Sequence, residues 1–191
     1  MRVSLYIKLL PLYVGLATLF ASPFYLSYEH TQEVHAAARS AQVQLDKKPK
    51  TTPISGKPVR IVLPEVGVDV PVVDGYYISA QRGWYVAPAD ATYAINTYPI
   101  NNTQGTTLIY GHWFSYVFGP TKNLKPGDTA IVYTDNGHIF QYNFENEVTV
   151  NPTDTTLFSN LNGKPTLKLM TCGGTWAQNR RFMTFNLIKA S

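Results

Sequence analysis

From residue 58 onward, the chain is a succession of short β-branched and aromatic runs separated by turns, without a long amphipathic helix. Runs of this kind predict strands. We predict eight of them: Val59–Leu63, Val66–Val73, Thr106–Tyr110, Thr129–Tyr133, His138–Phe144, Val148–Val150, Thr166–Thr171 and Phe182–Ile188. Many short strands in one small domain favour an all-β fold whose sheet closes on itself. We therefore expect an eight-stranded β-barrel with short helices.

Turn motifs between these runs support the same architecture. The segment Asp135-Asn136-Gly137 contains the Asn-Gly pair preferred in two-residue hairpins. The segment Lys125-Pro126-Gly127-Asp128 has the composition of another tight turn. Pro64 and Pro71 interrupt the first two runs. Because proline cannot donate to a strand ladder, these two positions predict sheet edges or bulges.

The amino-terminal end has a different character. Residues 9–26 are uncharged, with Arg2 and Lys8 before them and Glu29 after them. A helix needs roughly 20 apolar residues to cross a bilayer, and positive charge before it favours a cytoplasmic amino end. We predict a single-pass membrane anchor over residues 1–28, with the folded domain outside the cell. The alternative is a cleaved signal peptide, whose apolar stretch is only about 7–15 residues.

A stalk and a linker are predicted between the anchor and the barrel, over residues 29–57. Residues 29–45 are rich in alanine and glutamine and suit a helical stalk, which would place His30 and His35 in solvent. Residues 47–57 contain two prolines, a glycine and a run of lysines, which is typical of a linker. The folded domain is expected to span residues 58–191.

The charge pattern excludes some classes of function. The net charge of +4, from 16 Lys+Arg and 12 Asp+Glu, is modest. The basic residues gather near the linker and form no stripe interleaved with aromatics, as a nucleic-acid-binding surface would require. Six acidic residues of the domain are scattered singly: Glu65, Asp69, Asp74, Asp90, Asp128 and Asp154. They match neither an EF-hand nor a zinc site, so we propose no metal and no cofactor.

Cys172 is the only cysteine of the chain and therefore cannot form an internal disulfide. Outside the cytosol, an unpaired thiol either pairs with another chain or reacts. Alternation along its strand separates two sets of side chains: Leu167, Leu169 and Thr171 on one face, and Lys168, Met170 and Cys172 on the other. The leucine face is the better core candidate, so we expect Cys172 to face an outer groove. The alternative is an inert, buried cysteine.

A histidine and an arginine are candidate partners of this thiol. His112 follows a predicted strand, beside Gly111, whereas His138 follows the hairpin turn and is expected to be exposed. Arg180 has the parity opposite to the apolar face of the last strand, whereas Arg181 shares the parity of that face. We therefore expect Arg180 to lie beside Cys172. The alternatives are a hydrogen-bonded turn histidine and a solvated or ion-paired arginine pair.

These residues resemble the signature of a known family. The segment Leu167–Cys172, followed by Arg180, resembles the TLxTC…R signature of sortases, and Ile109–His112 resembles their catalytic histidine block. Further segments resemble the class F or E-like branch: Val59–Pro64, Gly67–Val72, Gly119-Pro120, Leu124–Asp128 and Thr171–Gly174. The resemblance extends from Pro58 to the carboxyl end. Trp113 departs from it, because a small or aliphatic residue is expected after the histidine.

The resemblance implies a fold, a reaction and partners. It implies a sortase-type barrel on a membrane anchor, which attaches surface proteins to the cell wall or to pili. The enzyme would be a cysteine transpeptidase that cleaves an LPXTG-like sorting signal near the carboxyl end of a surface protein. The new end would be joined to an amine of a peptidoglycan precursor or of a pilin. Cys172 would be the nucleophile, His112 the proton carrier, and Arg180 the oxyanion donor or substrate clamp.

Two other classes of protein remain as alternatives. L,D-transpeptidases also use cysteine, histidine and arginine, but their arginine stands two residues after the cysteine, where this chain has Gly174. The other alternative is a non-catalytic, membrane-tethered β-barrel that binds a partner and carries an unreactive thiol.

Overall fold

The computed structural model describes residues 32–33, 35–36, 39–40, 52–78, 83–154, 156, 161–174 and 177–191. The chain divides into two compact units, Met1–Thr51 and Thr52–Ser191. The described residues of the first unit are helical and exposed. The predicted anchor over residues 1–28 lies outside the described residues. Within the part that is described, no helix has both the length and the apolar character needed to span a bilayer.

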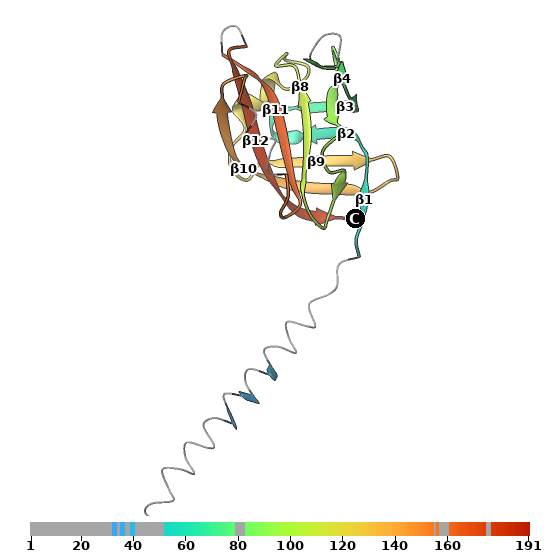
Figure 1. The fold of residues 1–191 in the computed structure, drawn as a ribbon, viewed down its shortest axis with the longest axis vertical. Helices are drawn as coiled ribbons and strands as arrows, with labels where there is room; N and C mark the ends of the chain where they lie inside the picture. The colour runs from blue at the N-terminus through green and yellow to red at the C-terminus, as the bar shows by residue number, and fades with distance from the viewer. Residues whose placement is uncertain are drawn as a thin grey trace, which may run out of the picture. The chain divides into compact units, whose positions relative to one another are not determined.

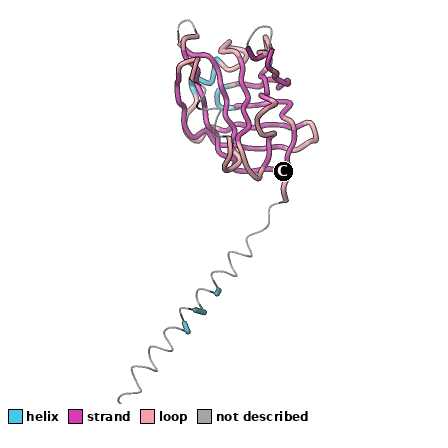
Figure 2. The backbone as a smooth tube through the Cα atoms, viewed as in Figure 1, coloured by secondary structure: helices cyan, strands magenta, loops and turns pink. Residues whose placement is uncertain are grey.

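The second unit is a closed barrel of eight strands, in the order β10-β12-β11-β8-β6-β3-β2-β9 (Figure 1). The strands are β2 (Pro58–Leu63), β3 (Val68–Gly75), β6 (Ala91–Ala94), β8 (Thr106–Gly111), β9 (Thr129–Thr134), β10 (Ile139–Val150), β11 (Thr166–Gly173) and β12 (Asn179–Ala190). The predicted all-β barrel is therefore confirmed. Figure 2 shows how strands and loops make up this unit, with little helix.

Smaller elements decorate the barrel. β1 (Ser55–Gly56) pairs with β7 (Ile100–Asn101), and β4 (Tyr77–Ile78) pairs with β5 (Gly83–Trp84). The 3-10 helices η1 (Pro64–Val66) and η3 (Gly119–Asn123) each have a proline in their first turn, where its missing N–H costs no hydrogen bond. β1 lies within the segment predicted as a linker.

The sequence predicted the number of barrel strands through two errors that cancel. The runs predicted at His138–Phe144 and Val148–Val150 belong to one strand, β10, which contains register shifts. β6 was not predicted. All four of its residues are buried, so it lacks the alternation that marks a strand with one wet face.

Both predicted turns are present. In the β9–β10 hairpin, the Thr134 N–H donates to the His138 carbonyl at 3.0 Å, and Gly137 has a φ of 86°. In the second turn, the Asp128 N–H donates to the Lys125 carbonyl at 2.9 Å. Pro71 lies opposite Arg60 of β2, and the β3–β6 ladder begins only after it, so no hydrogen bond to β6 is lost.

Two apolar clusters lie on opposite faces of the β8–β11–β12 region. The larger cluster fills the barrel and includes Ile109, Leu169 and Phe185, each fully buried. The smaller cluster lies on the other face and consists of Ala94, Leu108, Tyr110 and Phe182, with Val86, Val150 and Met170 packed against it. Every residue of β8 is therefore buried. Burial of one large apolar side chain contributes about 1.5–3 kcal/mol.

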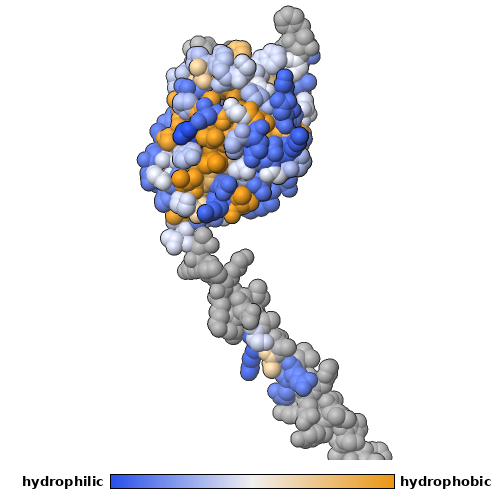
Figure 3. All heavy atoms as spheres, turned by 180° about the vertical axis from the view of Figure 1, so that it is seen from behind, coloured by the Kyte–Doolittle hydropathy of each residue, from blue (hydrophilic) through white to orange (hydrophobic). Residues whose placement is uncertain are grey.

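Several large apolar side chains remain at the surface of the second unit. They are Val59, Tyr76, Trp84, Ile95, Trp113, Phe114, Tyr116, Ile139, Val148 and Ile188. On the face shown in Figure 3, apolar areas lie between hydrophilic ones. Among these residues, Trp113, Phe114 and Tyr116 lie within the four positions after His112.

Candidate active site

The parallel pairing of β8 with β11 brings His112 and Cys172 to the same end of neighbouring strands. Thr171 is paired with Gly111, and the Thr171 Oγ1 donates to the Gly111 carbonyl at 2.9 Å. Because the two strands run in the same direction, the next residue on each one is His112 and Cys172. Two residues sixty positions apart in the chain are thus brought to neighbouring positions at the same end of the two strands.

Cys172 occupies the predicted face of β11. Leu167, Leu169 and Thr171 are buried, whereas the alternate positions, Cys172 among them, are only half-buried. The predicted alternation is confirmed, and the thiol is free. Its side chain also lines a cavity, so the interpretation as a cysteine sealed in the core is wrong.

A compact turn fixes the position of His112. The Phe118 N–H donates to the His112 carbonyl at 3.0 Å, and the imidazole stacks on the Phe114 ring with 4.9 Å between centroids. Gly119 closes this turn. A Cβ atom at Gly119 would lie 2.5 Å from the Trp113 carbonyl oxygen, so only glycine allows such a close approach.

Arg180 lies directly opposite Cys172 in the antiparallel β11–β12 ladder. Directly opposed residues of an antiparallel pair share one face of the sheet, so the predicted placement of Arg180 beside Cys172 agrees with the register. Its Nη1 donates to the carbonyls of Ala177 and Asn179, at 3.1 and 3.2 Å. Ala177 has a φ of 57°, which is uncommon for a residue other than glycine.

Arg181 faces the other way and is held by an ion pair. Its Nε donates to the Glu147 Oε1 at 2.7 Å, and its Nη2 donates to the other oxygen of the same carboxylate. The two side chains are only 17% and 29% exposed. The aliphatic part of Arg181 lies over Gly173, where a Cβ atom would be 2.9 Å from it. The guanidinium of this arginine is therefore engaged by a carboxylate.

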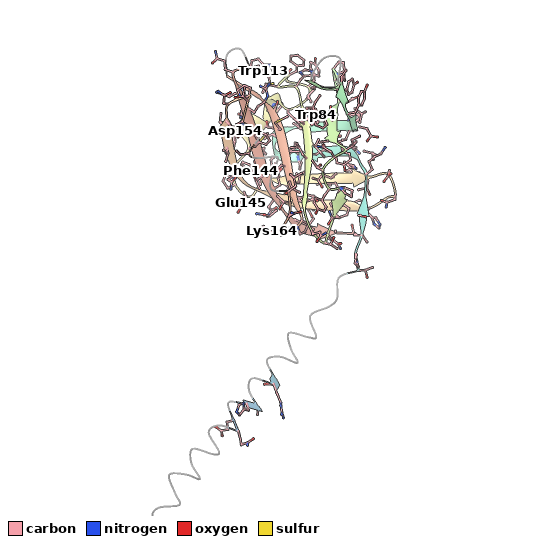
Figure 4. All side chains as sticks on the ribbon, viewed as in Figure 1. Trp84, Trp113, Phe144, Glu145, Asp154 and Lys164 are labelled. Carbon is pink, nitrogen blue, oxygen red and sulfur yellow. The ribbon has the colours of Figure 1, made fainter. Side chains whose placement is uncertain are left out.

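Two cavities lie near these residues. The first, of about 460 Å³, is lined by Trp84, Val86, Ala94, Asn96, Thr97, Leu108, Tyr110, Pro152, Asp154, Leu161, Met170 and Arg180. The second, of about 430 Å³, is lined by Trp113, Gly119, Lys122, Glu147, Cys172, Gly173, Gly174 and Arg181. Figure 4 labels Trp84 and Asp154 on the first cavity and Trp113 on the second. The thiol lines the second cavity, and Met170, two residues earlier, lines the first.

Comparison with known families decides what this arrangement is. The sequence model described as Sortase domain matches residues 61–187. The chain belongs to the sortase family. Sortases are cysteine transpeptidases, so the chain is an enzyme of that class, and its free cysteine lies in the described barrel. The family match also decides against an L,D-transpeptidase.

Solved sortase structures share this fold. Sortase A from Listeria monocytogenes is 24% identical with a TM-score of 0.56, and the match covers 70% of this chain and 89% of that one. Sortase E1 from Streptomyces coelicolor, solved with a tripeptide in its active site, is 18% identical with a TM-score of 0.58 (71% and 90% covered). Sortase C-3 from Streptococcus pneumoniae is 19% identical with a TM-score of 0.57 (72% and 65% covered). No curated protein sequence matches the chain.

Tyr110 forms part of the wall of the first cavity of this sortase. Its hydroxyl donates to the Tyr85 carbonyl at 2.6 Å, and burial raises the pKa of Tyr110 to about 12. The hydroxyl is therefore neutral at physiological pH. Gly75 leaves space for it, because a Cβ atom there would lie 2.2 Å from the Tyr110 oxygen.

Sequence reasoning missed the residues that surround the thiol in the second cavity. Lys122 comes from η3 and Glu147 from β10, far from Cys172 in the chain. No motif marks either residue. Among the described residues, no group of three or more histidine, cysteine or acidic side chains could hold a metal ion.

Proposed function

We propose that this sortase is anchored in the cell membrane and attaches surface proteins through Cys172, His112 and Arg180. The observation that carries this proposal is the strand register around Cys172. His112 follows the parallel neighbour of its strand, and Arg180 lies opposite it on the antiparallel neighbour. A half-buried thiol that lines a cavity is accessible to a substrate carbonyl.

In the first step, the Cys172 thiolate attacks the carbonyl carbon of the Thr–Gly bond in an LPXTG-like sorting signal. Arg180 donates hydrogen bonds to the oxyanion that forms, or to the substrate backbone beside it. The carbon–nitrogen bond then breaks, and protonated His112 gives its proton to the leaving amine. The product is a thioester between the substrate and Cys172.

In the second step, a neutral amine attacks the thioester carbonyl. His112 accepts the proton of this amine, and the electron pair of the carbon–sulfur bond returns to the Cys172 sulfur. The surface protein is then joined to a peptidoglycan precursor or to a pilin. No cofactor takes part in either step.

The first cavity suits the sorting signal. Its walls are largely apolar, as an extended Leu-Pro segment requires, and include Trp84, Leu108 and Met170. It also contains Arg180, which lies opposite Cys172. A peptide in this cavity contacts Arg180, the residue opposite the thiol.

The catalytic roles can be tested with alanine variants. Cys172→Ala and His112→Ala should each abolish cleavage of a fluorogenic peptide library built on Leu-Pro-Xaa-Thr-Gly, with the barrel intact by circular dichroism. His138→Ala is the matched control. That histidine contacts the carboxyl terminus, with its Nδ1 3.3 Å from the Ser191 carbonyl, so cleavage should persist. Cleavage by Cys172→Ala would end the proposal.

The domain organisation that we propose is an anchor over residues 1–28, a stalk and linker over residues 29–57 whose last residues pack on the barrel, and a catalytic domain over residues 58–191. It is supported by the uncharged run over residues 9–26 and the positive residues before it. Mass spectrometry of the mature protein should find Met1 or the apolar run still present. A mature chain that begins near Ser22 or Ala38 would show a cleaved signal peptide instead.

A further inference from the structure

Two cavities that differ in chemistry lie near the thiol: Cys172 lines the second, and Arg180, opposite it on β12, lines the first. The first is largely apolar, and the proposed function assigns it to the sorting signal. The second contains Cys172 itself together with Lys122, Glu147 and Arg181. A transpeptidase must admit a second substrate while the first is still attached to its thiol, so an approach on the other side of Cys172 is required.

The charges of the second cavity do not cancel. Arg181 and Glu147 form a bidentate ion pair and neutralise each other. No acidic side chain among the described residues lies within ion-pair distance of Lys122. The lining side chains of fixed charge therefore carry one net positive charge, which comes from Lys122.

The backbone that carries Lys122 is well fixed. The preceding residue, Thr121, is buried, and its Oγ1 donates to the Phe118 carbonyl at 2.5 Å. The Thr121 carbonyl also accepts a hydrogen bond from the Arg181 Nη2 at 3.5 Å. Lys122 itself is exposed. Its ammonium therefore extends from a rigid base at a cavity that also contains the thiol.

Trp113 gives the same cavity a flat apolar surface. Its side chain is 48% exposed, and it directly follows His112 in the chain. An aromatic face of this kind contacts the methylene groups of a short peptide or amino acid. The second cavity therefore combines an apolar wall, a cation and the reactive sulfur.

We propose that the second cavity binds the acceptor, and that the acceptor is a primary amine whose own molecule carries a carboxylate, which Lys122 attracts. This inference rests on the proposed function. The acceptor nitrogen forms a bond to the thioester carbonyl carbon, the carbon–sulfur bond breaks, and the proton of the amine passes to His112. The carboxylate takes no part in the chemistry and only orients the acceptor.

The first test compares acceptors that differ only in this carboxylate. Triglycine and triglycinamide have the same amino end, so the ratio of their kcat/KM values isolates the effect of the carboxylate. We expect the wild-type enzyme to prefer triglycine by about two- to fivefold, the range of a partly exposed ion pair. Lys122→Gln should reduce this ratio to about one, and Lys122→Glu should invert it.

The matched control is Lys125→Gln. Lys125 is exposed in the turn after η3 and does not line the cavity, so the preference should persist in this variant. Because each ratio is taken within one variant, a general change in rate cancels. A wild-type enzyme without preference, or an unchanged preference in Lys122→Gln, would overturn the inference.

The second test needs no sorting signal. Triglycine should slow the alkylation of Cys172 by iodoacetamide at concentrations at which triglycinamide has no effect, and Lys122→Gln should remove this protection. If triglycine protects the thiol of an enzyme that cleaves no sorting peptide, the acceptor cavity stands and the proposed function fails. If the enzyme forms its thioester but triglycine neither protects nor is preferred, the function stands and this inference is wrong.

Discussion

At the scale of single residues, the structure separates the roles of two adjacent arginines. Arg180 lies opposite Cys172 and donates to the nearby carbonyls of Ala177 and Asn179, whereas Arg181 is engaged by Glu147. The sequence predicted this difference from strand parity alone. It could not predict Glu147, because the contact depends on how the irregular strand β10 pairs with β12.

Substitution of Arg180 should therefore lower catalytic activity, whereas substitution of Arg181 should lower the stability of the barrel. Arg180→Ala removes a donor at the reacting carbonyl and should lower kcat/KM by about 10²–10³, with little change in the free energy of unfolding. Arg181→Ala leaves Glu147 without its partner, removes the aliphatic contact with Gly173, and should cost about 1 kcal/mol of stability. Peptide cleavage and urea denaturation measure the two effects. Loss of cleavage only in Arg181→Ala would show that the parity argument is wrong.

Gly119 is one of the residues that fix the position of His112. Gly119→Ala places a Cβ atom 2.5 Å from a carbonyl oxygen, so the turn that carries His112 must move. We expect a loss of about 1–3 kcal/mol in stability and a lower kcat. Gly137→Asn is the control, because a side chain there meets open space and asparagine tolerates its positive φ. Full activity and stability in Gly119→Ala would contradict the assignment.

At the scale of elements, one face of β11 packs in the core and the other face carries Cys172 of the candidate active site. Its alternation could be recognised in the sequence because Leu167 and Leu169 share one face, with Lys168 between them on the other. β6 was not predicted, since a strand buried on both faces shows no alternation. β8 is also buried throughout, but its β-branched and aromatic composition still predicted it. The cavities could not be predicted, because they depend on loops such as the turn between His112 and Gly119.

Alanine substitutions on the two faces of β11 should have different effects on stability and on substrate binding. Leu169 is fully buried in the barrel, so Leu169→Ala should cost about 2–5 kcal/mol in the free energy of unfolding. Met170 is half-buried on the other face and lines the first cavity. Met170→Ala should cost less stability and raise KM for the sorting peptide. Equal losses of stability, with KM unchanged, would contradict the assignment of that cavity.

Strand β8 makes the barrel sensitive to alkaline pH through Tyr110. Its pKa is raised to about 12 by burial, whereas an unfolded tyrosine titrates near 10. The stabilisation by the buried neutral hydroxyl is complete below about pH 10 and is lost as the pH rises toward 12. In Tyr110→Phe, the free energy of unfolding should decrease less steeply with pH over this range, by ~1.4 kcal/mol per pH unit. Urea denaturation across that pH range measures it, and an unchanged slope would refute the contribution.

At the scale of the whole molecule, the catalytic unit begins before the first barrel strand. Ile54 packs against the core, and its N–H donates to the Asn102 Oδ1 at 3.0 Å. The pairing of β1 with β7 also precedes residue 58. Composition alone could not reveal these contacts, because a segment rich in proline and lysine is typical of a linker.

Truncation at two positions tests this boundary. A fragment of residues 52–191 should unfold in a single transition and cleave the sorting peptide. A fragment of residues 58–191 loses Ile54 and the β1–β7 pair, and should be less stable by about 1–3 kcal/mol. Differential scanning calorimetry compares the two fragments. Equal stability would show that the residues before 58 contribute nothing to the barrel.

The most direct test of the account is the mass of the intact protein after mixing with a sorting peptide in the absence of an amine acceptor. The account predicts an increase equal to the peptide fragment before the cleaved bond, located on Cys172 and removed when triglycine is added. Cleavage of the peptide without such an adduct, or with the adduct on another residue, would contradict it.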